Sequence, residues 1–384
     1  KVLLPLGVES KGSLKKEKVI DLDPAILNKS QVKQKDVTAA NIIGETTKES
    51  SFSPEQSQHL KKQKEEKLKK QKFYLSQQKV FGDNGDILFE KLKENDSRVS
   101  ALLVKLKSKK ERLRAGHTLV EGWRLIVDGL EAKCLLKYVF FSRKTDLDKI
   151  RPFLPKTGVK LFKIPYKEVQ LWSNVETSPG IFGVFETPSA ENIQSQSRPL
   201  PLQFICDNIR EPGNLGAILR VAVGAGCEKV LISKGCVDVW DPKVIRSAAG
   251  AHFRLPIHHS IEWSDMPNFL EPNTSVFIAD SNSSDGGEEN ETQMLMPVLP
   301  YYSVEFSSLK HTTIVLGGET EGISQDSYSL AANKNGLRLN IPLQKGVDSL
   351  NTGMATAVIA FEIRKQLIKA WNKLKLEKQQ VLAT

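Results

Sequence analysis

The sequence predicts an α/β fold divided into two domains, and three observations lead to this prediction. From residue 98 onward, short apolar runs of strand length alternate with stretches in which apolar residues recur every three or four positions. Residues 188–202 interrupt this alternation, because they contain three prolines and show no periodicity. A second alternating series then follows. This pattern is typical of a sheet covered by helices, once before the interruption and once after it.

The first series predicts a small α/β domain over residues 91–187. A basic amphipathic helix is expected over residues 98–114, and a second helix over residues 123–130. The apolar residues of the first helix are Val99, Leu102, Leu103, Leu106 and Leu113. The strand candidates are residues 117–122, 139–141, 159–162 and 181–185.

The second series predicts a larger α/β domain over residues 203–384, after a linker at residues 188–202. Its expected strands are Gln203–Cys206, Lys229–Ser233, Val276–Asp280, Thr313–Leu316 and Leu337–Ile341. An acidic insertion at residues 281–310 is expected to be a surface loop. A closing helix is expected over residues 349–378. Its apolar stripe consists of Val358, Ile359, Ile363, Leu367 and Trp371.

Residues 1–90 form a basic, largely disordered N-terminal extension in this scheme. Residues 1–80 contain 17 Lys against 10 acidic residues, 17 − 10 = +7, so this part carries much of the formal net charge of +10. The basic balance points to a polyanionic partner such as nucleic acid. The Lys-rich stretch at residues 59–72 is either a helix that forms against RNA or a solvated arm.

The four cysteines predict neither a metal site nor a disulfide framework. They show no CxxC pair and no interleaved histidine spacing. They are Cys134, Cys206, Cys227 and Cys236.

The first candidate site follows the strand predicted at residues 203–206. The chain there reads DNIREPGNLGAILR, with a Pro-Gly turn, Asn214 at the expected N-cap of a helix, and Arg220 six residues later. Taken alone, this is also the pattern of a capping asparagine and a salt-bridged surface arginine. The position at the carboxyl end of a strand favours a ligand site. The later Gly224-Ala225-Gly226 ends the helix instead of opening it, so it predicts a C-cap and no dinucleotide loop.

Two further motifs lie near the C-terminus. Residues 313–324, TIVLGGETEGIS, are a β-branched strand that ends in a Gly-Gly turn, where the backbone can approach a ligand closely. Their two acidic residues, Glu319 and Glu321, could instead cap the following helix. Residues 339–353 are a strand, a loop and a Ser/Asn helix start, which alone indicate no more than a helix cap.

In this order, the three motifs resemble those of the SpoU (TrmH-like) RNA ribose 2′-O-methyltransferases. Residues 241–251, DPKVIRSAAGA, look like the segment between the first and second motifs of that family. The resemblance covers about residues 203–372, and residues 98–186 resemble the small substrate-binding domain that many members carry in front. Within the family, the chain is most similar to the mitochondrial large-subunit rRNA 2′-O-methyltransferases of animals.

The resemblance implies that the C-terminal domain is a SPOUT methyltransferase domain tied in a deep trefoil knot, an exception to the usual unthreaded topology. S-adenosylmethionine would lie in the knot, held largely by backbone groups. By position, the cofactor-binding residues would be Gly317, Ile341 and Leu350. The active-site residues would be Asn214, Arg220, Glu319, Ser349 and Asn351. The chain departs from the family just after this last residue, where it reads TGMAT in place of a Val-Ser-Val-Ala run, which concerns only local helix packing.

The implied activity is 2′-O-methylation of a ribose, expected to be that of a guanosine, in large-subunit rRNA. The 2′-hydroxyl makes RNA the substrate, because DNA lacks that group. A guanidinium is not readily deprotonated in a protein. We therefore hypothesise that Arg220 grips the adjacent phosphate and stabilises the developing alkoxide. Asn214 and Asn351 would orient Arg220 and the ribose, while Glu319 would fix the loop or help to bind the nucleotide.

The expected partners are large-subunit rRNA in a mitochondrial ribosome precursor and a second copy of the chain. The apolar stripe of the closing helix would form the dimer, unless it is buried inside one subunit. No membrane span is expected. The expected location is the mitochondrial matrix, and a first residue other than Met is compatible with removal of a targeting peptide. The alternatives are a tRNA ribose methyltransferase of the same family and a catalytically inactive rRNA-binding assembly factor.

Overall fold

The computed structural model describes residues 77–193, 198–280, 296–334 and 336–383, together with Glu66, Lys69, Phe73 and Tyr74. The predictions for most of the N-terminal extension and for residues 281–295 therefore lie outside the described residues.

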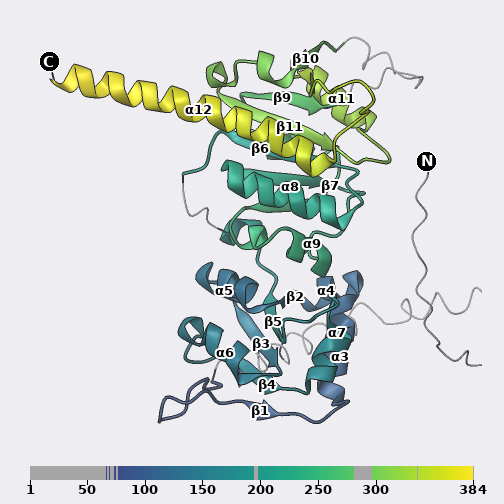
Figure 1. The fold of residues 1–384 in the computed structure, drawn as a ribbon, viewed down its shortest axis with the longest axis vertical. Helices are drawn as coiled ribbons and strands as arrows, with labels where there is room; N and C mark the ends of the chain where they lie inside the picture. Colours follow the sequence, from purple (N-terminus) through teal and green to yellow (C-terminus); the bar gives the residue numbers. More distant parts are fainter. Residues whose placement is uncertain are drawn as a thin grey trace, which may run out of the picture. The chain divides into compact units, whose positions relative to one another are not determined.

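The small domain contains a five-stranded sheet in the order β1-β4-β3-β5-β2 (Figure 1). Strand β5 runs antiparallel to β2 and β3, and the other neighbours are parallel. The strands are β1 (Glu90–Lys91), β2 (His117–Glu121), β3 (Leu136–Phe141), β4 (Lys160–Lys163) and β5 (Ile181–Glu186). The helices are α3 (Ser97–Lys107), α4 (Lys109–Ala115), α5 (Trp123–Glu131), α6 (Lys144–Ile150) and α7 (Tyr166–Trp172).

Helices cover both faces of this sheet. Successive residues of a strand point to opposite faces, and in these strands the residues on both faces are apolar. Phe140 of β3 packs in one core with Leu103 of α3 and Val169 of α7. Its neighbour Phe141 packs in the other core with Ile126 of α5. The α/β fold predicted for this domain is confirmed.

The boundaries of the small domain differ from those predicted. Lys79 pairs with Thr157 in an isolated bridge, and Val80 is fully buried, so the domain begins before residue 91. The predicted linker is also shorter, because Leu200 is buried in the core of the large domain. In both places a backbone hydrogen bond holds the apolar residue, because the N–H of Val80 donates to the carbonyl of Lys156 and that of Leu200 donates to the carbonyl of Gly226.

The single helix predicted over residues 98–114 is two helices, which break at Ser108. After the break the apolar stripe changes face: Leu113 is exposed, whereas Arg112 is 5 % exposed. Nη1 of Arg112 donates to the carbonyl oxygens of Leu106 (2.8 Å) and Lys107 (2.9 Å), and its Nη2 donates to Asp238 of the large domain. The guanidinium therefore satisfies the end of α3 and joins the two domains.

Replacing Arg112 with methionine should destabilise the chain by about 3 kcal/mol, because it leaves the largely buried Asp238 and two carbonyl groups without their donor. Urea unfolding would measure the loss. Arg114→Met is the matched control, since this neighbouring arginine is exposed and its ion pair with Glu111 is also exposed to solvent. Equal losses for the two variants would contradict the role given to Arg112.

The large domain contains a seven-stranded sheet in the order β10-β12-β9-β11-β6-β7-β8, and all of its ladders are parallel. The strands are β6 (Leu202–Asp207), β7 (Lys229–Ser233), β8 (Ile257–Ile261), β9 (Thr274–Ala279), β10 (Val298–Pro300), β11 (His311–Gly317) and β12 (Leu337–Asn340). The helices are α8 (Pro212–Ala225), α9 (Pro242–Ser247), α11 (Gln325–Ala332) and α12 (Thr352–Ala383).

Helices α8, α9 and α12 lie on one face of this sheet, side by side in Figure 1, and α11 lies on the other. Phe204 of β6 packs with Ile218 of α8 and Ile363 of α12, whereas the next residue, Ile205, packs with Tyr328 of α11. The α/β fold that the sequence predicts for this domain is confirmed, and the structure adds that its sheet is parallel. In the described ranges no helix is both long and apolar enough to cross a bilayer.

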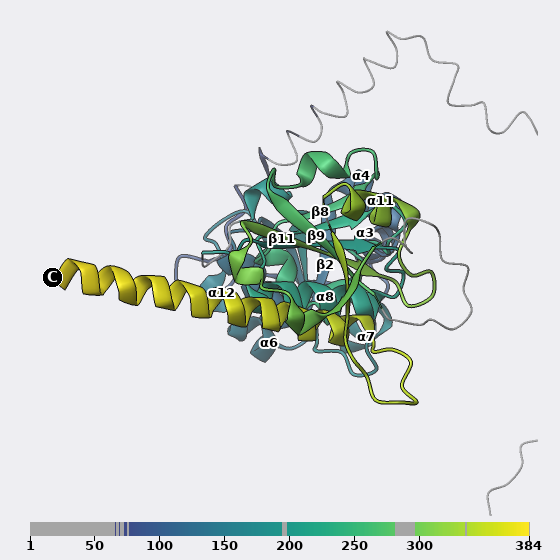
Figure 2. The same ribbon diagram turned by 90° about the horizontal axis from the view of Figure 1, so that it is seen from above.

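One prediction for the large domain is wrong. Residues 296–310 are not a loop: they form β10 and two short 3₁₀ helices, and Phe306 is fully buried. For the apolar stripe of the closing helix, the structure supports the second of the two alternatives, burial inside one subunit, because Ile359, Ile363 and Leu367 are buried against this domain's own core. Another face of α12 is exposed, and Figure 2 shows the helix extending past the sheet.

Candidate functional site

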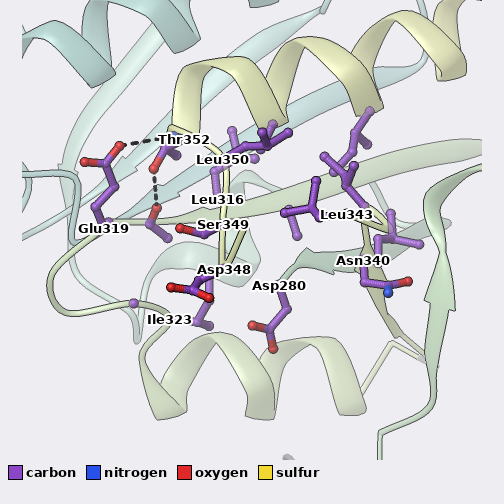
Figure 3. Close-up of a pocket in the computed structure, with 18 of the residues that line it drawn as sticks. Asp280, Leu316, Glu319, Ile323, Asn340, Leu343, Asp348, Ser349, Leu350 and Thr352 are labelled. Carbon is purple, nitrogen blue, oxygen red and sulfur yellow. Dashed lines mark hydrogen bonds between the residues drawn. The ribbon is translucent and has the colours of Figure 1, made fainter. Parts of the chain in front are cut away.

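The candidate site lies at the carboxyl ends of β6, β9, β11 and β12, which meet at one edge of the sheet. A pocket of about 940 Å³ opens there (Figure 3). The site residues predicted from the sequence that line it are Gly317, Glu319, Ile341, Ser349 and Leu350. The pocket therefore joins the second and third motifs.

The first motif places Asn214 beside this pocket. Glu211 is the N-cap of α8 and Pro212 is its first residue, so Asn214 is the third helical residue and its prediction as N-cap is wrong. Proline is favoured at this first position, because its fixed φ suits the helix and its missing N–H needs no partner. The amide of Asn214 can therefore project from the first turn toward another element. The predicted C-cap is confirmed, since Gly226 ends the helix with φ 82°.

The Gly-Gly turn after β11 lies against other parts of the chain. A Cβ atom on Gly318 would collide with the carbonyl oxygen of Asn208, and one on Gly317 would lie against the backbone of Gly322. The N–H of Gly322 donates to the carbonyl of Gly318 at 2.9 Å and closes the loop that carries Glu319. Glycine is thus required here by the crowding of the chain.

Asn351 joins the three motifs. Its Nδ2 donates to Oδ1 of Asn214 and to Oε1 of Glu319, each at 2.8 Å, and its Oδ1 accepts from N–H groups in the first turn of α12. The same oxygen of Glu319 accepts from the N–H of Thr352 at 3.2 Å (Figure 3). Glu319 therefore caps α12, whereas the N-cap of the helix that follows it is Ser324.

Arg220 stands apart from this cluster. It is exposed, six residues after Asn214 and so about 9 Å along the axis of α8. Among the described residues it makes no hydrogen bond or ion pair, so neither Asn214 nor Asn351 orients it. The ion pair of this region is a different one, between Arg210 and Glu321 at 2.6 Å. The charge of Arg220 is therefore available to a ligand.

Three carboxylates on the pocket lining were not predicted as site residues: Asp280, Glu321 and Asp348. Asp348 lies in the loop before α12, and Asp280 follows β9 (Figure 3). Oδ2 of Asp280 accepts from the hydroxyl of Tyr328 at 3.0 Å and from Nε of Arg338 at 2.8 Å. The signal for Asp280 was its place at the carboxyl end of a predicted strand.

Neither metal nor thiol chemistry is indicated in the part of the chain that the structure describes. No three His, Cys, Asp or Glu side chains there are grouped to hold a metal ion. Burial raises the pKa of the Cys206 and Cys227 thiols well above their usual range, and that of Cys134 to about 11. The cysteines are free, and none of them lines the pocket.

Two family models match the two domains of this chain. The model of the SpoU rRNA Methylase family matches residues 201–361, and that of the MRM3-like substrate binding domain matches residues 100–183. The "rRNA methyltransferase 3, mitochondrial" of Homo sapiens is 39% identical over 320 residues, which are 74% of this chain and 76% of that protein.

More distant relatives are bacterial. The 23S rRNA (guanosine(2553)-2'-O)-methyltransferase RlmP of Bacillus subtilis (strain 168) is 25% identical over 260 residues, 68% of this chain and 93% of that protein. The structure of the AdoMet-bound rRNA methyltransferase from Sinorhizobium meliloti superposes with a TM-score of 0.60 at 20% identity, covering 73% of this chain and 98% of that one. This chain and the Sinorhizobium meliloti protein therefore share one fold.

Proposed function

The chain belongs to the SpoU rRNA methylase family, and from this membership we propose that it transfers a methyl group from S-adenosylmethionine to a ribose 2′-hydroxyl of large-subunit rRNA. The observation that carries the proposal is the meeting of Asn214, Glu319 and Asn351, one from each motif, at the edge of the pocket. The name of the bacterial relative RlmP supports a guanosine as the target, and the names of the mitochondrial relatives support mitochondrial rRNA as the substrate. We propose the matrix as the place of reaction.

The pocket fits S-adenosylmethionine in size and in charge. Its volume of about 940 Å³ lies within the range of roughly 300–1,000 Å³ that is usual for ligand sites. Glu319 and Asp348 line it and favour a ligand with positive charge, whereas the charge of Asp280 is already balanced by Arg338. When bound, the cofactor supplies an electrophilic methyl group on a sulfonium. The residues proposed to hold it, largely through backbone groups, are Gly317, Ile341 and Leu350.

The chain's own residues would position the ribose and stabilise charge. Arg220 would grip the phosphate next to the reacting nucleotide and stabilise the developing alkoxide, while the hydroxyl proton passes to a phosphate oxygen or to water. Much of the rate would come from alignment of the hydroxyl with the methyl group. Glu319 would act by holding the amide of Asn351. Ser349, which lines the pocket, is the fifth proposed active-site residue.

The test is methylation with labelled S-adenosylmethionine of three separate pools: rRNA, tRNA, and assembling large ribosomal subunits. We expect label in rRNA, either free or in particles, and we expect mapping to place the label on a single ribose. Label in tRNA alone would replace the proposed substrate. Absence of label from all three pools would support the inactive assembly factor.

The small domain supplies basic side chains for the RNA backbone. Lys105 and Lys107 of α3 and Lys109, Lys110 and Arg114 of α4 are all exposed. Such phosphate contacts are independent of sequence and weaken with salt. The trefoil knot remains a prediction, which follows from membership of the family.

We further infer that two copies of the chain pair through α12. The face formed by Met354, Phe361 and Leu376 is exposed, and a shallow groove runs along it beside Ile368. Exposed apolar residues in a row along one helix face favour burial against a partner. This is not the stripe predicted from the sequence, which the chain buries itself.

Phe361→Glu should weaken such a dimer at least about tenfold, because each copy would place a charge in the apolar contact. Sedimentation equilibrium would measure the change. Leu374→Glu is the control, since Leu374 is similarly exposed but lies on the opposite side of the helix. A monomeric wild-type chain, or equal effects of the two variants, would exclude this interface.

A further inference from the structure

Asp207, the last residue of β6, is a buried carboxylate that the mechanism above does not use. It is 1 % exposed, and no cation pairs with it among the described residues. Its Oδ2 accepts from the N–H of Ser324 at 2.7 Å and from Oγ of Ser327 at 2.8 Å, and its Oδ1 accepts from Oγ of Ser233 at 3.3 Å. A carboxylate in the interior requires such donors, and together they hold it in one orientation.

These donors place Asp207 beneath the loop that carries Glu319. Ser324 is the N-cap of α11, so the carboxylate lies at the positive end of that helix. The carbonyl oxygen of the same aspartate accepts from the N–H of Gly318 at 3.0 Å. Both ends of the segment from Gly318 to Ser324, here called the Glu319 loop, are therefore tied to one residue of the first motif.

Between these two attachment points the Glu319 loop is exposed. Glu319 and Glu321 are both exposed, and the carboxylate of Glu319 accepts hydrogen bonds from Asn351 and Thr352. Within the loop, the N–H of Gly322 donates to the carbonyl of Gly318 and Glu321 pairs with Arg210. The two ties to Asp207 and these two contacts together set the position of the Glu319 carboxylate. An error of about 1 Å at a reacting centre can lower a rate about 100-fold.

We infer that Asp207 is a positioning residue, which fixes the Glu319 loop so that Glu319 can hold Asn351 at the start of α12. Its effect on methyl transfer rests on the proposed function, whereas its effect on the loop does not. Asp207, in the first motif, would therefore act on the second motif directly and on the third through Glu319, without touching substrate or cofactor.

Two substitutions separate geometry from charge. Asp207→Ala leaves three donors unpaired, and we expect kcat to fall about 100-fold and S-adenosylmethionine to bind more weakly, because the loop lines the pocket. Asp207→Asn can keep the arrangement: its amide oxygen can accept from Ser324 and Ser327 while its NH₂ donates to Ser233. We expect it to recover activity to within about tenfold of the wild type.

A double-mutant cycle tests whether Asp207 acts through Glu319. In a Glu319→Ala background, Asp207→Ala should lower kcat by no more than about threefold further. Asp146→Ala is the matched control. Asp146 is also a buried carboxylate, bonded to Arg143 and Lys149 in the small domain, so its loss should lower Tm without changing the Kd for S-adenosylmethionine.

Amide hydrogen exchange makes the result independent of activity. In Asp207→Ala, exchange should rise at the Glu319 loop and at the N–H of Thr352. Unchanged exchange there, or losses of kcat that simply add in the cycle, would overturn the inference. A wild-type chain without methyl transfer, combined with raised exchange in the variant, would instead refute the proposed function and leave the positioning role standing.

Discussion

Arg220→Lys is expected to lower kcat about 100-fold, nearly as far as Arg220→Ala, if the guanidinium grips a phosphate and faces the developing alkoxide. Lysine keeps the positive charge but loses the planar pair of donors that bind two oxygens at once. Single-turnover methylation of rRNA at saturating cofactor would measure the chemical step.

Arg210→Lys is the control for this substitution. Arg210 lies in the same motif and is already paired with Glu321, so a lysine there can keep the ion pair, and kcat should change little. Near-normal activity of Arg220→Lys would argue against a planar grip and leave only a point charge. Both variants should fold like the wild type, because both side chains are exposed.

Asn351→Asp should lower activity about 100-fold or more while leaving the chain folded. Oδ1 would still cap α12, since aspartate caps helices as well as asparagine does. The second oxygen would replace an NH₂ group that donates to Asn214 and Glu319, so that three acceptors would face one another. The substitution therefore breaks the cluster without removing the cap. Steady-state kinetics and thermal unfolding of the same preparation would separate the two effects.

The activity of Asn351→Asp should also depend on pH in a predictable direction. The new carboxyl would lie beside the carboxylate of Glu319, which raises its pKa. Its protonated form can donate one hydrogen bond, so activity relative to the wild type should rise as the pH is lowered. Asn351→Ala cannot regain a donor and should show no such recovery. A constant ratio of Asn351→Asp to wild type across the pH range would contradict the hydrogen-bond cluster.

The central strands were predictable because their apolar runs are continuous. The strand expected at Thr313–Leu316 lies within β11, which is buried on both faces. By contrast, β8 was missed, since its centre is His258-His259-Ser260 and shows no apolar run. It is an edge strand, paired on one side only, so polar residues are tolerated there.

Helix faces were harder to predict than helices. The stripe of α12 was placed correctly in sequence, but nothing local to it shows whether the partner is α8 of the same chain or a second copy. The single helix expected over residues 98–114 does not place Arg112 among its buried residues, whereas the break at Ser108 turns this side chain inward. Burial of a charge depends on the partner that it meets, here Asp238 of the other domain.

By itself, the sequence determined the alternation of strands and helices, the order of the three motifs, and through them the family and its chemistry. These features are local, since each is encoded within a few residues of propensity, capping and turn formation. Only the tertiary structure decided which groups meet. Asn351 bonds to Asn214 across 137 positions of sequence, and Asp207 lies beneath the Glu319 loop, because parallel strands bring their carboxyl ends to one edge. Strand order depends on packing of the whole domain, which no single motif contains.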